Sequence, residues 1–267
     1  MASSASQASS SSAKKGKILV LGGTGFVGSN VAQLAIERGY EVVALSRRGE
    51  PTGASRSGAA SKIAWRKGDA TKKADIEKVM EEGGFTAVVH AIGMLFETEL
   101  NKYASGSGSV PRAGSTYDEI TRQTAFNAME AAASSSSASS DPIPFAFVSA
   151  AEVRWTFDKS FEGTPLDWLR RYLIAKRAVE SELIDVYGAG GLLKPIIVRP
   201  SLIWTWDRPG ALLPVAAFTF GNRLGLPFVD KPVQVSTLSK AILKGLESKS
   251  EKGVYNFEGM ERLAKEF

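Results

Sequence analysis

Residues 17–28 read Lys-Ile-Leu-Val-Leu-Gly-Gly-Thr-Gly-Phe-Val-Gly, and this stretch decides the fold. The apolar run at 18–21 is typical of a buried parallel strand. Glycines follow at GxxGxxG spacing, and a helical pattern then runs to position 38. Three glycines also suit a tight turn without a ligand. The order of strand, glycine turn and helix start favours a pyrophosphate site, because backbone N–H groups and the helix dipole attract an anion there.

Strand-like and helical patterns alternate along most of the chain. Further strands are expected at 41–46, 63–67, 87–92, 144–149 and 195–199, and helices at 26–38, 73–82, 117–132 and 165–187. This alternation predicts an α/β fold, a Rossmann-type doubly wound parallel sheet with ligands at the carboxyl ends of its strands.

The same patterns divide the chain into three parts. We expect a disordered or targeting tail at 1–15 and an NAD(P)-binding Rossmann domain at 16–200. The alternation fades after Pro200, so residues 201–267 are expected to form a small substrate-side cap packed on the same core.

Composition excludes several classes of function. The chain has 267 residues, enough for one large core, and it has no cysteine and one histidine, His90. These counts argue against disulfides, a metal site and a Ser-His-Asp triad. The net charge of +5 is spread along the chain, which argues against nucleic-acid binding. The longest apolar run, 212–220, is half of the roughly 18–20 residues that a membrane span needs.

The end of the second strand predicts the choice of dinucleotide. NAD sites usually place a carboxylate there, but this chain has Ser46, Arg47 and Arg48. A hydroxyl and two guanidiniums suit a 2′-phosphate, which arginine binds bidentately. The pattern favours NADP(H); NAD(H) and a merely solvated arginine loop stay open.

Other strand ends supply the remaining expected contacts to the dinucleotide. Asp69 follows the third strand, where the adenine is expected, and small residues follow the fourth strand. The full set of predicted cofactor-binding residues is Gly22, Thr24, Gly25, Phe26, Val27, Gly28, Ser46, Arg47, Arg48, Asp69, Ala70, Ala91, Ile92, Gly93, Lys176 and Pro200.

A Tyr-x-x-x-Lys pair, Tyr172 and Lys176, lies in a helical segment 23 residues after Ser149. The four-residue spacing puts both side chains on one helix face. A free phenol has a pKa near ~10, and a nearby ammonium favours its ionised form. The alternative is an amphipathic helix with a surface lysine.

The chain resembles an atypical or extended short-chain dehydrogenase/reductase (NAD-dependent epimerase/dehydratase-like) over about residues 15 to 260. The resemblance rests on the glycine turn at 22–28, Gly68-Asp69, the 172–176 pair and the run from Arg199 to Trp204. It implies that Tyr172 moves a proton, that Lys176 tunes it, and that Ser149 hydrogen-bonds a substrate carbonyl. It also implies that Tyr172 and Lys176 hold the nicotinamide ribose.

Within that superfamily the chain is similar to a quinone-associated branch. This branch includes the Rossmann accessory subunit of mitochondrial NADH:ubiquinone oxidoreductase, a coenzyme Q synthesis accessory protein and plastid plastoglobule relatives. The similarity rests on 148–150, 172–180 and 228–231. The chain departs from active extended members at two positions, with Ala150 in place of a second serine and Thr121 in place of an asparagine.

Two functions follow from the resemblance. The first is an NADP(H)-dependent carbonyl or quinone-related oxidoreductase, or an epimerase, acting in or beside ubiquinone metabolism on a quinone-like or other small carbonyl substrate. The second is a non-catalytic NADPH-binding assembly subunit of a quinone-linked complex. Four aromatic residues after Pro200 have two interpretations: they form an apolar wall for the substrate, or they belong to the hydrophobic core. They are Trp204, Trp206, Phe218 and Phe228.

The first 13 residues hold seven serines and no acidic side chain. Transit peptides share this composition but usually carry arginine, which is absent from this stretch. We expect an organellar protein, mitochondrial ahead of plastid, with a cytoplasmic location left open.

Overall fold

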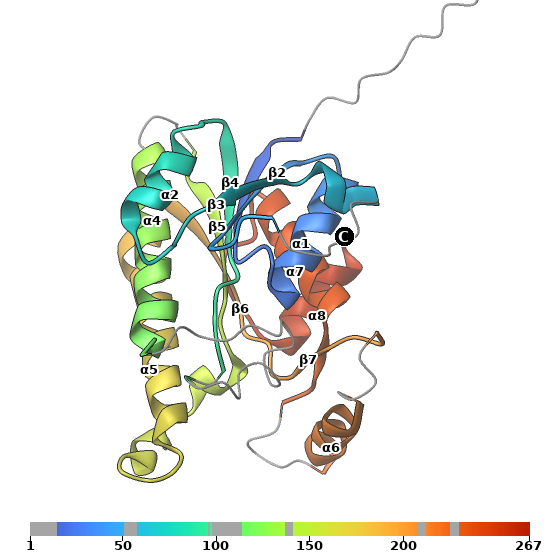
Figure 1. Cartoon of the computed structure of the whole chain (residues 1–267). Coiled ribbons are helices and arrows are strands. Elements are labelled where there is room, and N and C mark those ends of the chain that lie inside the picture. Colours follow the sequence, from blue (N-terminus) through green and yellow to red (C-terminus); the bar gives the residue numbers. More distant parts are fainter. Residues whose placement is uncertain are drawn as a thin grey trace, which may run out of the picture.

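The sheet that organises the molecule has seven parallel strands within the part of the chain that the computed structural model describes. That part comprises residues 15–50, 58–95, 97, 114–136, 141–207, 212–224 and 230–267. The strands are β1 (Lys17–Leu21), β2 (Glu41–Ser46), β3 (Ala64–Lys67), β4 (Phe85–His90), β5 (Ile143–Val148), β6 (Leu193–Val198) and β9 (Gly253–Tyr255), in the spatial order β3-β2-β1-β4-β5-β6-β9 (Figure 1).

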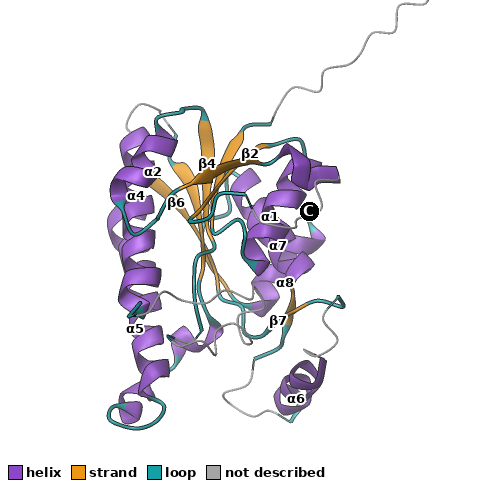
Figure 2. Cartoon of the chain, viewed as in Figure 1, coloured by secondary structure: helices purple, strands orange, loops and turns teal. Residues whose placement is uncertain are grey.

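Helices cover both faces of the sheet, as Figure 2 shows with the strands between two helical layers. One layer holds α2 (Lys73–Met80), α4 (Thr124–Ser136) and α5 (Asp167–Ser181), and the other holds α1 (Phe26–Glu37), α7 (Val235–Glu247) and α8 (Phe257–Lys265). In β1, Leu19 and Leu21 pack in the first core cluster, whereas Ile18 and Val20 pack in the second. Because both faces are buried, the strand reads as a continuous apolar run.

The strand order confirms the doubly wound α/β fold that the sequence predicts. The chain runs outward from β1 through β2 to β3, then returns to β4 on the other side of β1. The carboxyl ends of β1 and β4 therefore meet where the winding reverses. Ligands of such sheets bind in the crevice at this position.

Short 3₁₀ and π segments join these elements. The 3₁₀ turns are η1 (Gly58–Lys62), η3 (Ala151–Arg154) and η4 (Asp158–Phe161), and the π-helices are η2 (Asp118–Gln123) and η5 (Glu182–Gly188). The predicted helices at 117–132 and 165–187 each contain one α-helix and one π-helix. Isolated π segments often occur at functional sites.

The region after Pro200 contains two kinds of structure. A two-stranded sheet of β7 (Ile203–Trp204) and β8 (Val233–Gln234), together with α6 (Leu212–Arg223), lies at one end of the molecule (Figure 1). The following α7, β9 and α8 continue the main fold, since β9 pairs with β6. The seventh strand was not predicted. None of the described helices has the length and apolar character needed to cross a bilayer.

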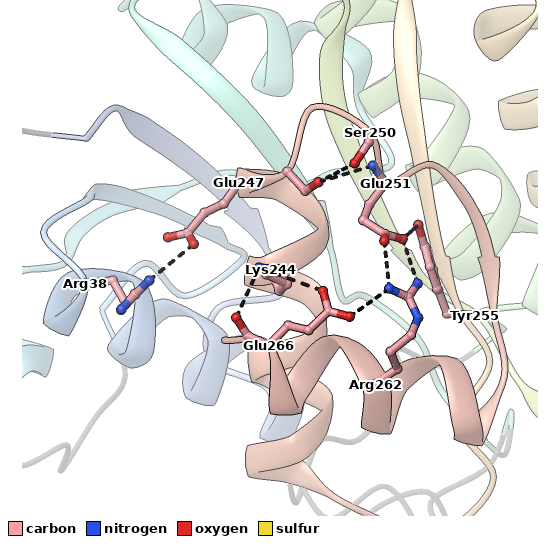
Figure 3. A network of polar contacts seen from close by, with 9 residues as sticks. Arg38, Lys244, Glu247, Ser250, Glu251, Tyr255, Arg262 and Glu266 are labelled. Atoms are coloured by element: carbon pink, nitrogen blue, oxygen red, sulfur yellow. Dashed lines mark hydrogen bonds and ion pairs between the residues drawn. The ribbon is translucent and has the colours of Figure 1, made fainter.

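A polar network joins the last elements to α1, as Figure 3 shows. Glu251 accepts hydrogen bonds from two nitrogens of Arg262, at 2.8 and 2.9 Å, and from the Tyr255 hydroxyl at 2.9 Å. The Arg262 hydrogen bonds are the main reason that the pKa of Glu251 falls to about 2. On the α1 side, Arg38 pairs with Glu247 at 3.3 Å.

Candidate functional site

The three glycines of the β1–α1 turn have different structural roles. Gly22 has φ +82°, and a Cβ there would lie 2.9 Å from the Ala91 carbonyl oxygen. A Cβ on Gly28 would lie 2.3 Å from Gly22 O, so this glycine lets α1 approach the turn. A Cβ on Gly25 meets only Gly22 O, at 3.1 Å. Gly22 and Gly28 are therefore required by packing, and Gly25 is not.

An open cleft of about 250 Å³ lies in front of this turn. Gly25 is the N-cap of α1, and no side chain caps the helix. The helix N-terminus therefore faces the cleft with its positive dipole end, which fits the pyrophosphate of a dinucleotide. The cleft is lined by Thr24, Gly25, Phe26, Ser29, Asn30, Thr205 and Asp207.

Four of these lining residues were not predicted. Ser29 and Asn30 donate hydrogen bonds to the Phe26 carbonyl oxygen, at 3.2 and 2.8 Å, and thus lie on the first turns of α1. Their place in the first turns after the glycine motif was the available signal, because the start of this helix is expected to face the pyrophosphate. Thr205 and Asp207 follow β7, and their place beside the glycine turn depends on how the chain returns after Pro200.

The predicted 2′-phosphate residues lie at the carboxyl end of β2. Ser46 is the last residue of the strand, and its hydroxyl donates to Gly49 O at 2.5 Å. Arg47 and Arg48 are exposed and form no ion pair with any other described residue. Both guanidiniums are therefore available to an anionic ligand.

Hydrogen bonds between neighbouring residues stabilise the turn after β3. The Asp69 carboxylate accepts from the backbone N–H and the hydroxyl of Thr71, at 3.2 and 2.9 Å. The Ala70 side chain is buried in the core, and its carbonyl oxygen accepts from Asn127 at 3.0 Å. A contact from Ala70 to a ligand would therefore use its backbone N–H.

The end of β4 connects the glycine turn to the Tyr-x-x-x-Lys helix. The Ala91 N–H donates to Leu21 O at 3.0 Å, and Ile92 follows half-buried. Gly93 is exposed, and a Cβ there would lie 3.8 Å from Lys176 Nζ. The two predicted halves of the site thus meet at Gly93.

Tyr172, Lys176 and Ser149 come together at the carboxyl end of β5. Lys176 Nζ donates to the carbonyl oxygen of Val148, immediately before Ser149, at 2.6 Å and lies 5.5 Å from the Tyr172 ring centroid. Tyr172 packs in one cluster with Ala150. Ser149 is 4% exposed, and its hydroxyl has no hydrogen-bond partner within the described ranges. An unpaired buried hydroxyl is costly, so it fits a group that a ligand pairs.

Burial controls the titration of the site. It lowers the pKa of Lys176 to about 8, although the negative charges of Glu180 and Glu152 oppose this shift. Burial also raises the pKa of Tyr172 above its usual value, with further contributions from Glu152 and Tyr117. The phenol is therefore protonated at neutral pH and can donate a proton.

The one histidine lies behind the Tyr172–Lys176 pair. His90 Nε2 is 2.9 Å from the Thr124 hydroxyl, which itself donates to Ile120 O. Burial and the Lys176 charge lower the pKa of His90 to about 3, so the ring is neutral at ordinary pH.

Glu152, on η3, is a site residue that sequence analysis missed. Burial raises its pKa, and the charge of Asp230 adds to the effect. The neighbouring Arg154 pairs with Asp230 at 2.7 Å, which links η3 to the segment before β8. A single glutamate in a short 3₁₀ turn belongs to no sequence pattern, so it could not be predicted.

The loop after β5 is held by its neighbours. The Pro200 carbonyl oxygen accepts from the Ala151 N–H at 2.9 Å. Arg177 donates to Val153 O at 2.9 Å and pairs with the buried Asp158 at 2.8 Å. These bonds fix the segment that carries Glu152 against α5.

The two departures from the dehydrogenase pattern are both buried. Ala150 is 3% exposed, and because its side chain is a methyl group it supplies no hydroxyl beside Ser149. Thr121 lies in η2, and its hydroxyl has no hydrogen-bond partner in the described part of the chain.

The proposed aromatic wall is only partly described. The rings of Trp204 and Trp206 meet edge to face, with 4.9 Å between their centroids. Trp206 is 67% exposed, and Phe218 is half-buried. Phe228 lies outside the described residues. The wall remains a prediction.

Comparison with protein families gives a match over most of the chain. The model of the NAD dependent epimerase/dehydratase family matches residues 18–204. This range contains the glycine turn and the Tyr172–Lys176 pair.

Two relatives among known proteins align over much of the chain. MIOREX complex component 2 of Saccharomyces cerevisiae is 26% identical over 91% of this chain and 97% of its own length. An uncharacterized chloroplastic protein of Arabidopsis thaliana is 28% identical over 72% of this chain, which spans 52% of that protein.

Solved structures share the fold at low identity. A short-chain type dehydrogenase/reductase from Mycobacterium ulcerans superposes with a TM-score of 0.66 at 18% identity, covering 93% of this chain and 90% of its own. ElxO with NADP bound gives 0.63 at 16%, covering 92% and 98%. UDP-glucose 4-epimerase from Brucella ovis with NAD gives 0.59 at 18%, covering 90% and 76%.

Proposed function

Because the chain belongs to the NAD dependent epimerase/dehydratase family, we propose that it binds a nicotinamide dinucleotide at the glycine turn, with NADP(H) preferred over NAD(H). The observation that carries the proposal is the α1 N-terminus, which no side chain caps and which faces the cleft at Gly25. Exposed Arg47 and Arg48 at the end of β2 support the preference for a 2′-phosphate.

We further propose that the protein reduces a carbonyl or quinone-like substrate. The bound dinucleotide supplies the hydride. Tyr172 donates the proton, consistent with its raised pKa, and Ser149 hydrogen-bonds the substrate oxygen. Lys176 is positively charged at pH values below its pKa of about 8. This charge stabilises the phenolate that forms when Tyr172 gives up its proton.

A second candidate is a dinucleotide-binding subunit of a larger assembly with weak or no turnover. Ala150 favours it, because the second hydroxyl of active members is missing. The relative from Saccharomyces cerevisiae, which is named as a component of a complex, also supports it. Quinone metabolism as the setting of either function rests on the resemblance described above.

The dinucleotide preference is tested by fluorescence titration and native mass spectrometry. The unmodified protein should bind NADPH at least tenfold more tightly than NADH, about 1.4 kcal/mol. The Arg47→Ala/Arg48→Ala variant should lose most of this difference while NADH affinity stays the same. A Lys240→Ala/Lys265→Ala variant removes the same charge from exposed positions on α7 and α8 and should keep the preference. Equal affinities in the unmodified protein contradict the proposal.

We also propose an organellar location, mitochondrial ahead of plastid. The serine-rich start supports it, as does the chloroplastic relative. A fluorescent protein fused to the C-terminus should co-localise with an organelle marker, and uniform cytoplasmic fluorescence contradicts the proposal.

A further inference from the structure

A buried base and a buried acid lie one turn apart on α5. Lys176 and Glu180 are each 4% exposed. Side chains at i and i+4 share a helix face, and a lysine and a glutamate at this spacing commonly pair. Here they do not. Lys176 Nζ donates to Val148 O at 2.6 Å, and Glu180 is bound by another residue.

The residue that binds Glu180 is Arg199, directly after β6. Arg199 Nε donates to one carboxylate oxygen of Glu180 at 3.0 Å, and its Nη2 donates to the other. The backbone N–H of Arg199 donates to Tyr255 O at 2.9 Å, so the arginine is fixed to the edge of the sheet. A planar guanidinium that contacts both oxygens leaves the carboxylate little freedom to turn.

This pairing leaves Lys176 with unused donors. An ammonium has three hydrogens, and Val148 O accepts one of them. The Lys176 side chain comes within 3.8 Å of the position of a Cβ on Gly93, at the mouth of the proposed dinucleotide site. Without Arg199, Glu180 would be a buried unpaired charge, which is strongly unfavourable, and Lys176, one turn earlier on α5, could pair with it.

We infer that Arg199 is a positioning residue that holds Glu180 away from Lys176, so that Lys176 stays at Val148 O with donors free for a ligand. The role in ligand binding rests on the proposed function. The pairing itself concerns the ligand-free protein and is tested without a dinucleotide.

Several groups besides Glu180 act on Lys176 from the elements around it. They are Glu152 on η3, His90 on β4, Tyr172 on α5, and the Phe147 ring on β5, which lies 5.0 Å from Nζ. Burial lowers the pKa of Lys176. Among the charges that raise this pKa, Glu180 has the largest effect. Removing Glu180 should therefore lower the pKa of Lys176, and removing Arg199 should raise it.

The experiment measures this pKa directly. We would titrate ligand-free protein carrying ¹³Cε-labelled lysine by NMR, with Lys176→Met identifying the signal. The pKa of Lys176 should fall in Glu180→Gln, rise in Arg199→Gln, and return close to the unmodified value in the double variant. The matched control is Arg262→Gln, which breaks another bidentate arginine–glutamate pair at Glu251 and should leave Lys176 unchanged.

NADPH titration at pH 7 tests the consequence for binding. Arg199→Gln should weaken binding at least tenfold, and the added Glu180→Gln should recover affinity to within about threefold of the unmodified protein. A merely structural role for Arg199 predicts no such recovery, because the double variant still lacks the arginine. Circular dichroism checks folding; if Arg199→Gln does not fold, Glu180→Gln and the double variant carry the test.

The outcomes separate the inference from the proposed function. An unchanged pKa of Lys176 in Arg199→Gln, or no recovery of binding in the double variant, overturns the inference. Failure of the unmodified protein to bind any dinucleotide overturns the proposed function, and the pKa measurements still decide whether Arg199 controls Glu180.

Discussion

Gly25 and Gly28 belong to one motif but serve different ends. A side chain at Gly28 would collide with the Gly22 carbonyl, which is backbone and cannot move aside cheaply. A Cβ on Gly25 would meet only the Gly22 carbonyl oxygen, at 3.1 Å, and Gly25 lines the cleft. The motif therefore combines a packing requirement with a binding requirement, and substitutions should separate them.

Gly25→Val should abolish NADPH binding while the protein stays folded, because the β-branched side chain occupies the place where the pyrophosphate approaches the backbone. Gly28→Val should instead destabilise the fold by at least about 2 kcal/mol through overpacking. Isothermal titration calorimetry and urea unfolding of both variants check this. Normal NADPH affinity in Gly25→Val would show that the site has been misplaced.

Tyr172 is the side chain whose chemistry can be isolated. If the protein is an oxidoreductase, Tyr172→Phe should lower turnover by roughly 10²–10⁴-fold, as loss of a general acid does, with much less effect on NADPH affinity. NADPH absorbance with a panel of ketones and quinones gives the rates. Tyr40→Phe, which removes a hydroxyl bonded to Glu247, is the control and should keep full activity. Turnover that survives Tyr172→Phe removes this residue from the mechanism.

The final elements α7, β9 and α8 depend on a small number of charges. The Glu251 carboxylate accepts hydrogen bonds from Arg262 and Tyr255, and these lower its pKa from an ordinary 4.5 to about 2. A carboxylate whose pKa is lower in the folded state contributes stability above its unfolded pKa, and this contribution is lost as pH falls. The relevant window here is pH 5 to 2.

Glu251→Gln should lower the free energy of unfolding at pH 7 by about 0.2–1 kcal/mol, the range measured for exposed ion pairs. The difference from the unmodified protein should shrink as pH falls from 5 toward 2, because Glu251 is then protonated in both states. Urea unfolding at several pH values measures it. A difference that stays constant over this range would mean that packing, not charge, supplies the effect.

The predicted elements succeed where a local pattern determines them. The strand at 18–21, the glycine turn and the helices behind it follow from apolar periodicity within short windows. β9 was not predicted because a three-residue strand that begins with Gly253 has too few apolar positions for a pattern. Its place in the sheet comes from pairing with β6, a contact between residues more than 50 positions apart.

The candidate site divides in the same way. Residues directly after strands, such as Arg47, Gly93 and Ser149, were predictable because carboxyl ends of parallel strands share one edge. The contact of Arg199 with Glu180, and the effect of the Glu152 charge on Tyr172, depend on how separate elements pack. Spacing along the chain carries no record of them.

The fold as a whole places the proposed dinucleotide site between two halves. The glycine turn and β2 lie on one side of the switch point, and the Tyr172–Lys176 helix lies on the other. A dinucleotide that contacts both sides binds the folded state and not the unfolded chain, so it stabilises the protein by mass action.

NADPH at one hundred times its dissociation constant should add about 2.7 kcal/mol of stability. For a chain of this size that corresponds to a rise in Tm of roughly 5–8 °C. Differential scanning calorimetry measures the shift, and Gly25→Val should show none at the same NADPH concentration. An unmodified protein whose Tm does not respond to NADPH argues against a dinucleotide site.

Glu247 is also the point at which the two ends of the described chain come together. Lys15 pairs with it at 3.4 Å, and Arg38, its other partner, lies over the ring of the terminal Phe267 at 4.4 Å. Lys15 and Phe267 therefore lie near the amino ends of the strands, whereas the cleft lies at their carboxyl ends. A surface or partner that contacts Lys15 and Phe267 would therefore lie at the opposite end of the strands from the cleft.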